Sequence, residues 1–174
     1  MTKQMGFYID TDRCTACKAC EIACKNRNKL GVGPRLRQVH QIISGDYPDL
    51  KITNVSMGCM HCEKPACMAV CPVGAISKRA QDGIVVVDRS ICIGCHACAQ
   101  ACPFGVPQYD ADGTMVKCDY CLEFQEIGKG PACAENCMYE ALHWGTMEEL
   151  TEMVREKAAE RMVAATKPSG FIKA

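Results

Sequence analysis

The cysteine pattern constrains this chain more than any other feature. Sixteen of its 174 residues are cysteine, and they fall into four groups of four with none left over. The first and third groups read C-x2-C-x2-C-x3-C, the second reads C-x2-C-x4-C-x3-C, and the fourth reads C-x2-C-x11-C-x3-C. The groups are Cys14, Cys17, Cys20, Cys24; Cys59, Cys62, Cys67, Cys71; Cys92, Cys95, Cys98, Cys102; and Cys118, Cys121, Cys133, Cys137. So many cysteines in a short chain predict that disulfides or bound metal organise the fold.

The spacing favours iron–sulfur clusters. C-x2-C-x2-C-x3-C is the bacterial 4Fe–4S ligand run, whose fourth cysteine binds the other cluster of a pair. Three closely spaced thiolates can reach three iron corners of one cubane, and the fourth lies one helical turn further on. Structural zinc prefers cysteine pairs set well apart, which only the fourth group resembles. A disulfide scaffold fits less well, because the first residues form no apolar signal segment. The sequence therefore predicts four 4Fe–4S clusters.

An internal repeat indicates the fold class. Residues 6–10 and 84–88 are short apolar segments that each end in Asp, four residues before the first cysteine of a group. Residues 75–78 and 84–87, separated by a turn at 81–83, predict a β-hairpin between the second and third groups. These two groups would form one two-cluster ferredoxin unit, which leaves the first and fourth groups to pair as another.

We therefore expect an α+β fold of two fused bacterial-type ferredoxin units, one inserted in the other and organised by metal around a small core. Residues 1–55 with 106–145 would form the outer unit, 56–105 the inserted unit, and 146–174 a C-terminal helix and tail. The helix is expected over 146–165, beginning with a capping box of Thr146 and Glu149 and presenting one apolar face of Leu150, Met153, Val154 and Met162. Two further strands are expected at 35–43 and 51–56.

Interleaving of the fourth cysteines assigns the ligands to four sets. The expected iron ligands are Cys14, Cys17, Cys20 and Cys137 (set 1); Cys24, Cys118, Cys121 and Cys133 (set 2); Cys71, Cys92, Cys95 and Cys98 (set 3); and Cys59, Cys62, Cys67 and Cys102 (set 4).

Several other residues invite a functional interpretation. His61 and His96 lie inside cysteine loops, where we expect hydrogen-bond donors to cluster sulfur rather than ligands. Arg35 and Arg37 are expected on a solvated strand edge, and Trp144 is expected to be buried beside the last helix.

Composition excludes several classes of protein. Lys and Arg together equal Asp and Glu at 20 each, which argues against binding nucleic acid by neutralising phosphates. No apolar run approaches the roughly 18 residues of a membrane span. We find no nucleophile–base pair, phosphate-binding loop or carboxylate dyad. The chain is expected to be non-catalytic and to move electrons for another subunit.

The sequence resembles the four-cluster iron–sulfur subunits of the DMSO reductase family of molybdopterin oxidoreductases. The matching stretches are GFYID at 6–10, CTAC at 14–17, CEKPAC at 62–67, CIGC at 92–95, ACPFGVPQY at 101–109 and KCDYC at 117–121. The resemblance implies a molybdopterin-containing catalytic subunit as partner and, in many members, a membrane anchor subunit that exchanges electrons with quinol. It also implies an order in which set 1 faces the catalytic subunit and sets 2, 3 and 4 follow.

Folding and cluster insertion are expected in the cytoplasm, with any export or membrane association through the catalytic partner. Two alternatives remain open. One is a polyferredoxin-like subunit of a formate dehydrogenase, hydrogenase or carbon monoxide dehydrogenase, which metal analysis of the complex would distinguish. The other is a zinc-binding interaction module, which would be colourless.

Overall fold

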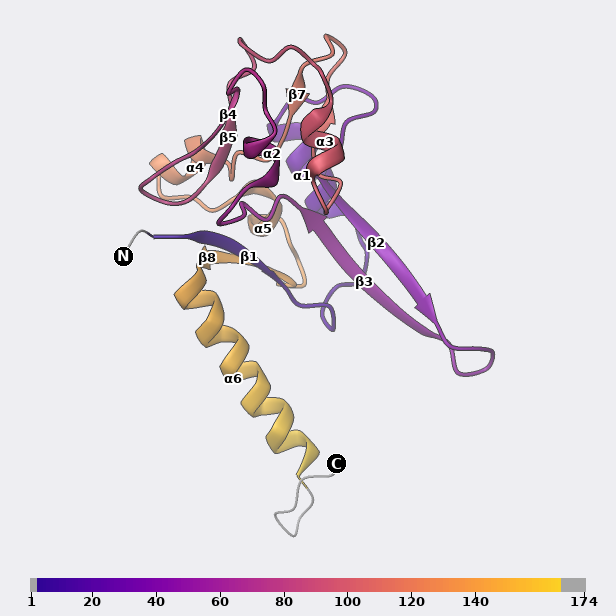
Figure 1. Ribbon diagram of the computed structural model, residues 1–174. Helices are drawn as coiled ribbons and strands as arrows, with labels where there is room; N and C mark the ends of the chain where they lie inside the picture. The colour runs from indigo at the N-terminus through magenta and orange to yellow at the C-terminus, as the bar shows by residue number, and fades with distance from the viewer. Residues whose placement is uncertain (1–2, 167–174) are drawn as a thin grey trace.

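The computed structural model describes residues 3–166, so the predicted tail beyond Thr166 lies outside the described residues. A body of cysteine loops and short elements carries two projections, a hairpin of β2 and β3 and the helix α6 (Figure 1). The strands are β1 Met5–Ile9, β2 Arg37–Ser44, β3 Lys51–Gly58, β4 Ile76–Lys78, β5 Val85–Val87, β6 Gln108–Tyr109, β7 Met115–Val116 and β8 Leu142–Thr146. The helices are α1 Ala19–Arg27, α2 Ala66–Ala69, α3 Ala97–Ala101, α4 Leu122–Glu126, α5 Ala132–Glu135 and α6 Met147–Ala165.

Two antiparallel strand pairs repeat the same local arrangement. β4 and β5 form the predicted hairpin, which is confirmed, with Ile76 opposite Val87. β1 and β8 pair from opposite ends of the chain, with register from Met5↔Thr146 to Ile9↔Leu142. One more backbone bond closes each pair, since the N–H of Asp88 donates to Ala75 O and that of Asp10 donates to Ala141 O, both at 2.7 Å. The two aspartates of the sequence repeat therefore occupy equivalent places.

The helices show the same repetition. α1 packs against α5, and α2 packs against α3. The fold is thus a small mixed α/β arrangement of ferredoxin-type elements. The division into an outer and an inserted unit stays a prediction.

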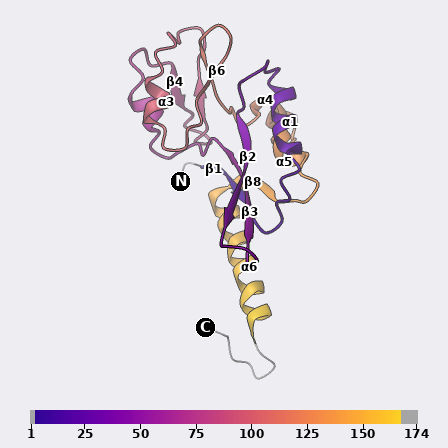
Figure 2. The same cartoon turned by 90° about the vertical axis from the view of Figure 1, so that its right-hand side faces the viewer.

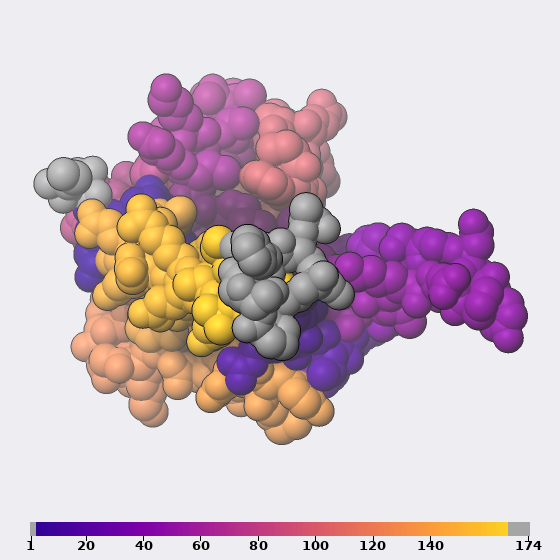
Figure 3. Space-filling model, turned by 90° about the horizontal axis from the view of Figure 1, so that it is seen from below, coloured from indigo at the N-terminus to yellow at the C-terminus, as the bar shows by residue number. Residues whose placement is uncertain are grey.

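The β2–β3 hairpin has a buried base and an exposed end. The two predicted strands are confirmed and pair over their whole length, from Arg37↔Gly58 to Ser44↔Lys51. The hairpin points toward the viewer in Figure 2, in front of α6, and projects far from the body in Figure 3. We call residues 42–52 the arm. Its apolar side chains are all more than half exposed: Ile42, Ile43, Tyr47, Leu50 and Ile52.

The last helix, α6, begins where it was predicted to begin, but less of its apolar face packs against the body than expected. Both bonds of the Thr146–Glu149 capping box are present, which confirms that prediction. Of the expected apolar face only Leu150 is buried, while Val154 and Met162 are exposed, because the helix extends beyond the body (Figure 1). The expectation for Trp144 is wrong, since its side chain lies on β8 with 36% of its surface exposed.

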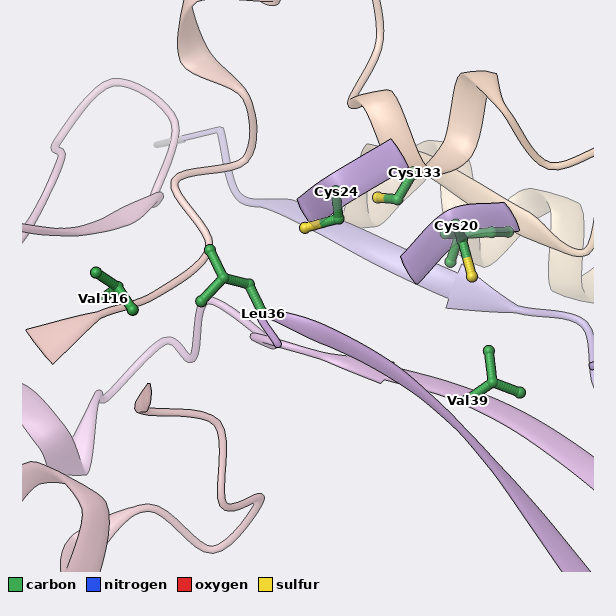
Figure 4. Packing of buried hydrophobic residues seen from close by; sticks show 7 residues of the cluster. Cys20, Cys24, Leu36, Val39, Val116 and Cys133 are labelled. Atoms are coloured by element: carbon green, nitrogen blue, oxygen red, sulfur yellow. The ribbon is translucent and has the colours of Figure 1, made fainter. Parts of the chain in front are cut away.

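The core is small and contains the cysteines themselves. Cys20, Cys24 and Cys133 pack with aliphatic side chains at the start of β2 and on β7, as Figure 4 shows. No helix within residues 3–166 combines the length and the apolar character needed to cross a membrane.

Candidate iron–sulfur sites

Each cysteine group bends the chain in the same way. The residue before the second cysteine has a positive φ in all four groups: Ala16 (57°), His61 (44°), Gly94 (64°) and Tyr120 (62°). A left-handed residue reverses the backbone sharply and can turn successive amides toward one concave side. This conformation is costly for a residue with a side chain, so the surrounding structure has to hold it. The first two cysteines of each group can then face the same space.

One cavity is bordered by the four cysteines of set 3. Cys71 comes from the second group, and Cys92, Cys95 and Cys98 come from the third. The backbone N–H of Ala75 donates to Cys71 Sγ at 3.2 Å, and the Tyr109 hydroxyl lies 3.2 Å from Cys98 Sγ. Burial would raise the pKa of Cys71, but several backbone N–H groups outweigh it and lower that pKa, which favours the thiolate.

A second cavity is bordered by the four cysteines of set 1. Cys14, Cys17 and Cys20 belong to the first group, and Cys137 reaches the cavity from the fourth. The N–H of Ala141 donates to Cys137 Sγ at 3.2 Å, which is the counterpart of the Ala75–Cys71 bond.

The cysteines of set 2 are all buried. Cys24 on α1 and Cys133 on α5 lie next to each other with their sulfurs turned to the same side, whereas the Cys20 sulfur points away from them (Figure 4). Burial raises the pKa of Cys24 to about 12, and it raises those of Cys118 and Cys121 as well. A bound metal therefore has to displace protons from these thiols.

Of the cysteines of set 4, Cys59 is buried and the other three are partly buried. Burial raises the pKa of Cys67, Lys117 opposes that shift, and Cys59 and Cys102 add to it as neighbouring thiols. Burial also raises the pKa of Cys118, and Cys59 is the strongest charged neighbour acting on it. Set 4 thus lies beside set 2.

The position of Cys59 favours a different order of the sets from the one that the resemblance implies. The resemblance placed set 4 last, but Cys59 is buried beside set 2, whereas Cys17 of set 1 and Cys95 of set 3 are exposed. We therefore expect the order set 1, set 2, set 4, set 3, in which the last two sets are exchanged relative to the order that the resemblance implies. Spacing specifies which cysteines can share a cluster but not which clusters are neighbours.

His61 is buried against Tyr120 and Val85, with 1% of its surface exposed. Burial, together with the nearby cations Lys117, Arg37 and Lys78, lowers its pKa to about 2, so the imidazole is neutral. Its Nδ1 accepts the N–H of Val85 at 3.0 Å, which leaves the proton on Nε2. Nε2 has no hydrogen-bond partner within residues 3–166.

Sequence reasoning missed three further buried polar side chains. Arg37 was expected on a solvated edge, and that is wrong, since only 3% of its surface is exposed. Lys117 is also buried, and the Tyr120 hydroxyl donates to Gly6 O and accepts the N–H of Gly145 at 3.2 Å. Arg37 stands at an inward position of β2, beside buried Val39 at the next inward position, and this alternation was the only available signal.

The thiols are not arranged for single metal ions. A structural zinc needs four ligands around one ion. Within the part of the chain that the structure describes, no three His, Cys, Asp or Glu side chains converge in this way. Two cavities that are each lined by four thiols from two cysteine groups fit cubane clusters.

Comparisons with known proteins agree with this chemistry. The family model described as "4Fe-4S dicluster domain" matches residues 50–147, and "4Fe-4S binding domain" matches residues 7–27. The probable anaerobic dimethyl sulfoxide reductase chain YnfG of Escherichia coli K12 is 45% identical over 161 residues, which cover 87% of this chain and 78% of that one. A further anaerobic dimethyl sulfoxide reductase subunit of the same strain is 44% identical over 168 residues (91% and 82%), and its Protein NrfC is 36% identical over 172 (94% and 77%).

The number of cysteines, the ferredoxin-type matches and these relatives together identify a protein of four 4Fe–4S clusters that relays electrons. The chain belongs to the 4Fe–4S dicluster family, among the iron–sulfur subunits of the DMSO reductase type.

Proposed function

We propose that the chain is the electron-transfer subunit of a molybdopterin oxidoreductase. Electrons would pass through four clusters between a molybdopterin catalytic subunit and a quinol-linked membrane subunit or another redox partner. The observation that carries the proposal is the pair of cavities, each bordered by four thiols from two separate cysteine groups. The choice of catalytic partner rests on the relatives named as chains of anaerobic dimethyl sulfoxide reductase.

The four sets are the proposed cluster ligands, and the residues around them fit that role. Each bound cluster would accept and release one electron. Backbone N–H groups already donate to Cys71, Cys137, Cys118 and Cys92 sulfurs at 3.2–3.5 Å, as expected around thiolate ligands. The unpartnered Nε2–H of His61 also needs an acceptor, which a sulfur of set 2 or set 4 would supply. In this assignment the outer ferredoxin unit contains segments from both ends of the chain, and the pairing of β1 with β8 joins them.

The arm is the proposed contact with the catalytic subunit. Its base is tied to set 1, because Asn54 Nδ2 donates to Cys14 O at 2.7 Å and the Ser56 hydroxyl lies 3.4 Å from Cys20 Sγ. A partner that exchanges electrons at the exposed side of set 1 would therefore also reach the arm. Its exposed aliphatic side chains suit an apolar groove on that partner.

Set 3 would then exchange electrons with the membrane subunit or another donor. Exposed apolar side chains also surround this end, including Val73, Ile91 and Ile93. We expect cluster insertion in the cytoplasm and membrane association or export only together with the partners.

Purification of a tagged chain under anaerobic conditions tests the proposal. We expect about sixteen iron and sixteen acid-labile sulfide per chain, and a copurifying subunit that contains molybdenum or tungsten with a pterin. Nickel in the partner would instead favour a hydrogenase or carbon monoxide dehydrogenase subunit. Several zinc atoms per chain without sulfide would end the iron–sulfur assignment.

A further inference from the structure

Two buried basic side chains, Arg37 and Lys117, form no ion pair with a carboxylate of residues 3–166. Arg37 and Lys117 are 3% and 6% exposed. The ion pairs within residues 3–166 engage eight other basic side chains but neither of these two. Burying a charge without a counter-ion is strongly unfavourable, so each cation needs an anion that is not a side-chain carboxylate.

Arg37 lies at the junction of sets 1 and 2. Its Nη1 donates to the carbonyl oxygen of Ser56 at 3.1 Å and to the Ser56 hydroxyl at 3.3 Å. Its guanidinium carbon lies 4.6 Å from the centre of the Phe7 ring. The Ser56 hydroxyl that it contacts lies 3.4 Å from Cys20 Sγ of set 1. Val39, the next inward residue of β2, packs in the same buried cluster as Cys24 and Cys133 of set 2.

The backbone opposite Arg37 leaves space for this side chain. Gly58 is its cross-strand partner, and a Cβ at Gly58 would meet Arg37 Nη2 at 3.0 Å and Cζ at 3.1 Å. The arginine can therefore cross over its partner strand toward the cysteines.

Lys117 lies at the junction of sets 2 and 4. Its Nζ donates to the carbonyl oxygens of Cys118, at 2.7 Å, and of Val85. Cys118 belongs to set 2, and the N–H of the same Val85 donates at 3.0 Å to Nδ1 of His61, which directly precedes Cys62 of set 4. One buried cation thus lies between sets 1 and 2, and another lies between sets 2 and 4.

We propose that Arg37 and Lys117 are shared counter-ions of neighbouring clusters, Arg37 for sets 1 and 2 and Lys117 for sets 2 and 4. A 4Fe–4S cluster with four thiolates is an anion, and reduction by one electron adds a further negative charge. A fixed cation stabilises the reduced form more than the oxidised form, so it raises the reduction potential. Both residues are positioning residues, because they act on the clusters without ligating iron. The inference rests on the proposed ligand sets and not on the identity of the partner.

Potentiometric titration of the purified complex, followed by EPR, tests this assignment. Arg37→Gln and Arg37→Met should lower the potentials of the clusters of sets 1 and 2 and leave the other two unchanged. Lys117→Gln and Lys117→Met should lower those of sets 2 and 4. Set 3 should not respond to either change. We expect at least a tenfold change in each affected reduction equilibrium, which is about 59 mV for one electron. Arg35→Gln and Lys129→Gln remove exposed charges and serve as controls.

The charge-conserving variants Arg37→Lys and Lys117→Arg separate charge from packing. They should keep most of the wild-type potential. In another outcome, the neutral variants lose clusters while Arg37→Lys and Lys117→Arg retain all four. That result would also support a requirement for positive charge at these positions. Loss of clusters in neutral and charged variants alike, or unchanged potentials in neutral variants with full iron content, would overturn the proposal.

Discussion

Asp10 and Asp88 each organise the loop that leads into a cysteine group. The Asp10 carboxylate accepts the N–H of Asp12 at 3.0 Å, and Asp88 accepts the N–H of Ser90 at 2.9 Å. Asp10 also forms an ion pair with Lys157 of α6. One buried carboxylate therefore connects the strand β1, the loop before Cys14 and the last helix.

Replacing Asp10 should loosen the loop of set 1. We expect Asp10→Ala to lower the free energy of unfolding by roughly 1–3 kcal/mol, because the N–H groups and Lys157 lose their acceptor. Iron should be released faster to a chelator, measured as loss of visible absorbance. Asp46→Ala, in the exposed turn of the arm, is the control and should behave as wild type. An Asp10→Ala protein with wild-type release rates would contradict the role.

The same carboxylate carries a pH dependence. Burial raises the pKa of Asp10, but Lys157 and the N–H groups outweigh burial and hold it below its ordinary value of 3.8. Its folded pKa is thus depressed, so its stabilisation is present above pH 3.8 and is lost as pH falls through the lower folded value. Iron release from the wild type should accelerate in that acid range, and Asp10→Ala should show less of this acceleration.

The roles of some single residues could be predicted from the sequence, and those of others could not. The sixteen cysteines could be identified as ligands because iron–sulfur chemistry fixes their type and spacing. Arg37 could not be recognised as an interior cation, because a strand pattern does not show what lies above its inner face. That information depends on α1, α5 and the fourth group, which are distant in sequence.

Among the elements, α1 holds ligands for two different sets. Cys20 and Cys24 lie one turn apart, yet Cys20 borders the cavity of set 1 and Cys24 lies beside Cys133. Cys24→Ser should therefore perturb the EPR signal of the cluster that also depends on Cys118. Cys20→Ser should perturb the cluster that depends on Cys14. If both variants altered the same cluster, the interleaving would be wrong.

The arm should govern assembly rather than cluster binding. Ile43 and Ile52 face each other across the two strands, and both are exposed. A double Ile43→Asp, Ile52→Asp variant should retain its full iron content but bind the catalytic subunit at least tenfold more weakly, about 1.4 kcal/mol. Val32→Asp, in a fully exposed loop, is the matched control. If the double variant copurified with the catalytic subunit as well as the wild type does, the arm would not be part of the interface.

Periodicity predicted the elements better than their packing. It located the β2–β3 strands and the start of α6 because turns, caps and alternation are local properties. It did not predict that Val154 and Met162 would stay exposed, because this depends on where the body ends.

At the scale of the molecule, the core is too small to fold the chain unaided. Several of the buried apolar residues are the cysteines themselves, and burial raises the pKa of Cys24 to about 12. Removing iron leaves protonated thiols around spaces that no side chain fills. We expect the iron-free chain to be largely unfolded, without a cooperative thermal transition in circular dichroism. A transition like that of the iron-loaded protein would show that apolar packing suffices.

The order of the clusters is a property of the whole molecule, and magnetic coupling between neighbours can test it. Set 4 lies beside set 2 through Cys59 and Cys118, so the two reduced clusters should broaden each other's EPR signals. Cys62→Ser, which alters set 4, should change the line shape of the set 2 cluster. Cys95→Ser, which alters set 3 at the exposed end, should leave that line shape unchanged. Both variants have to retain the remaining clusters by iron analysis. The opposite result, coupling of set 2 to set 3 and not to set 4, would restore the order that the family resemblance implied.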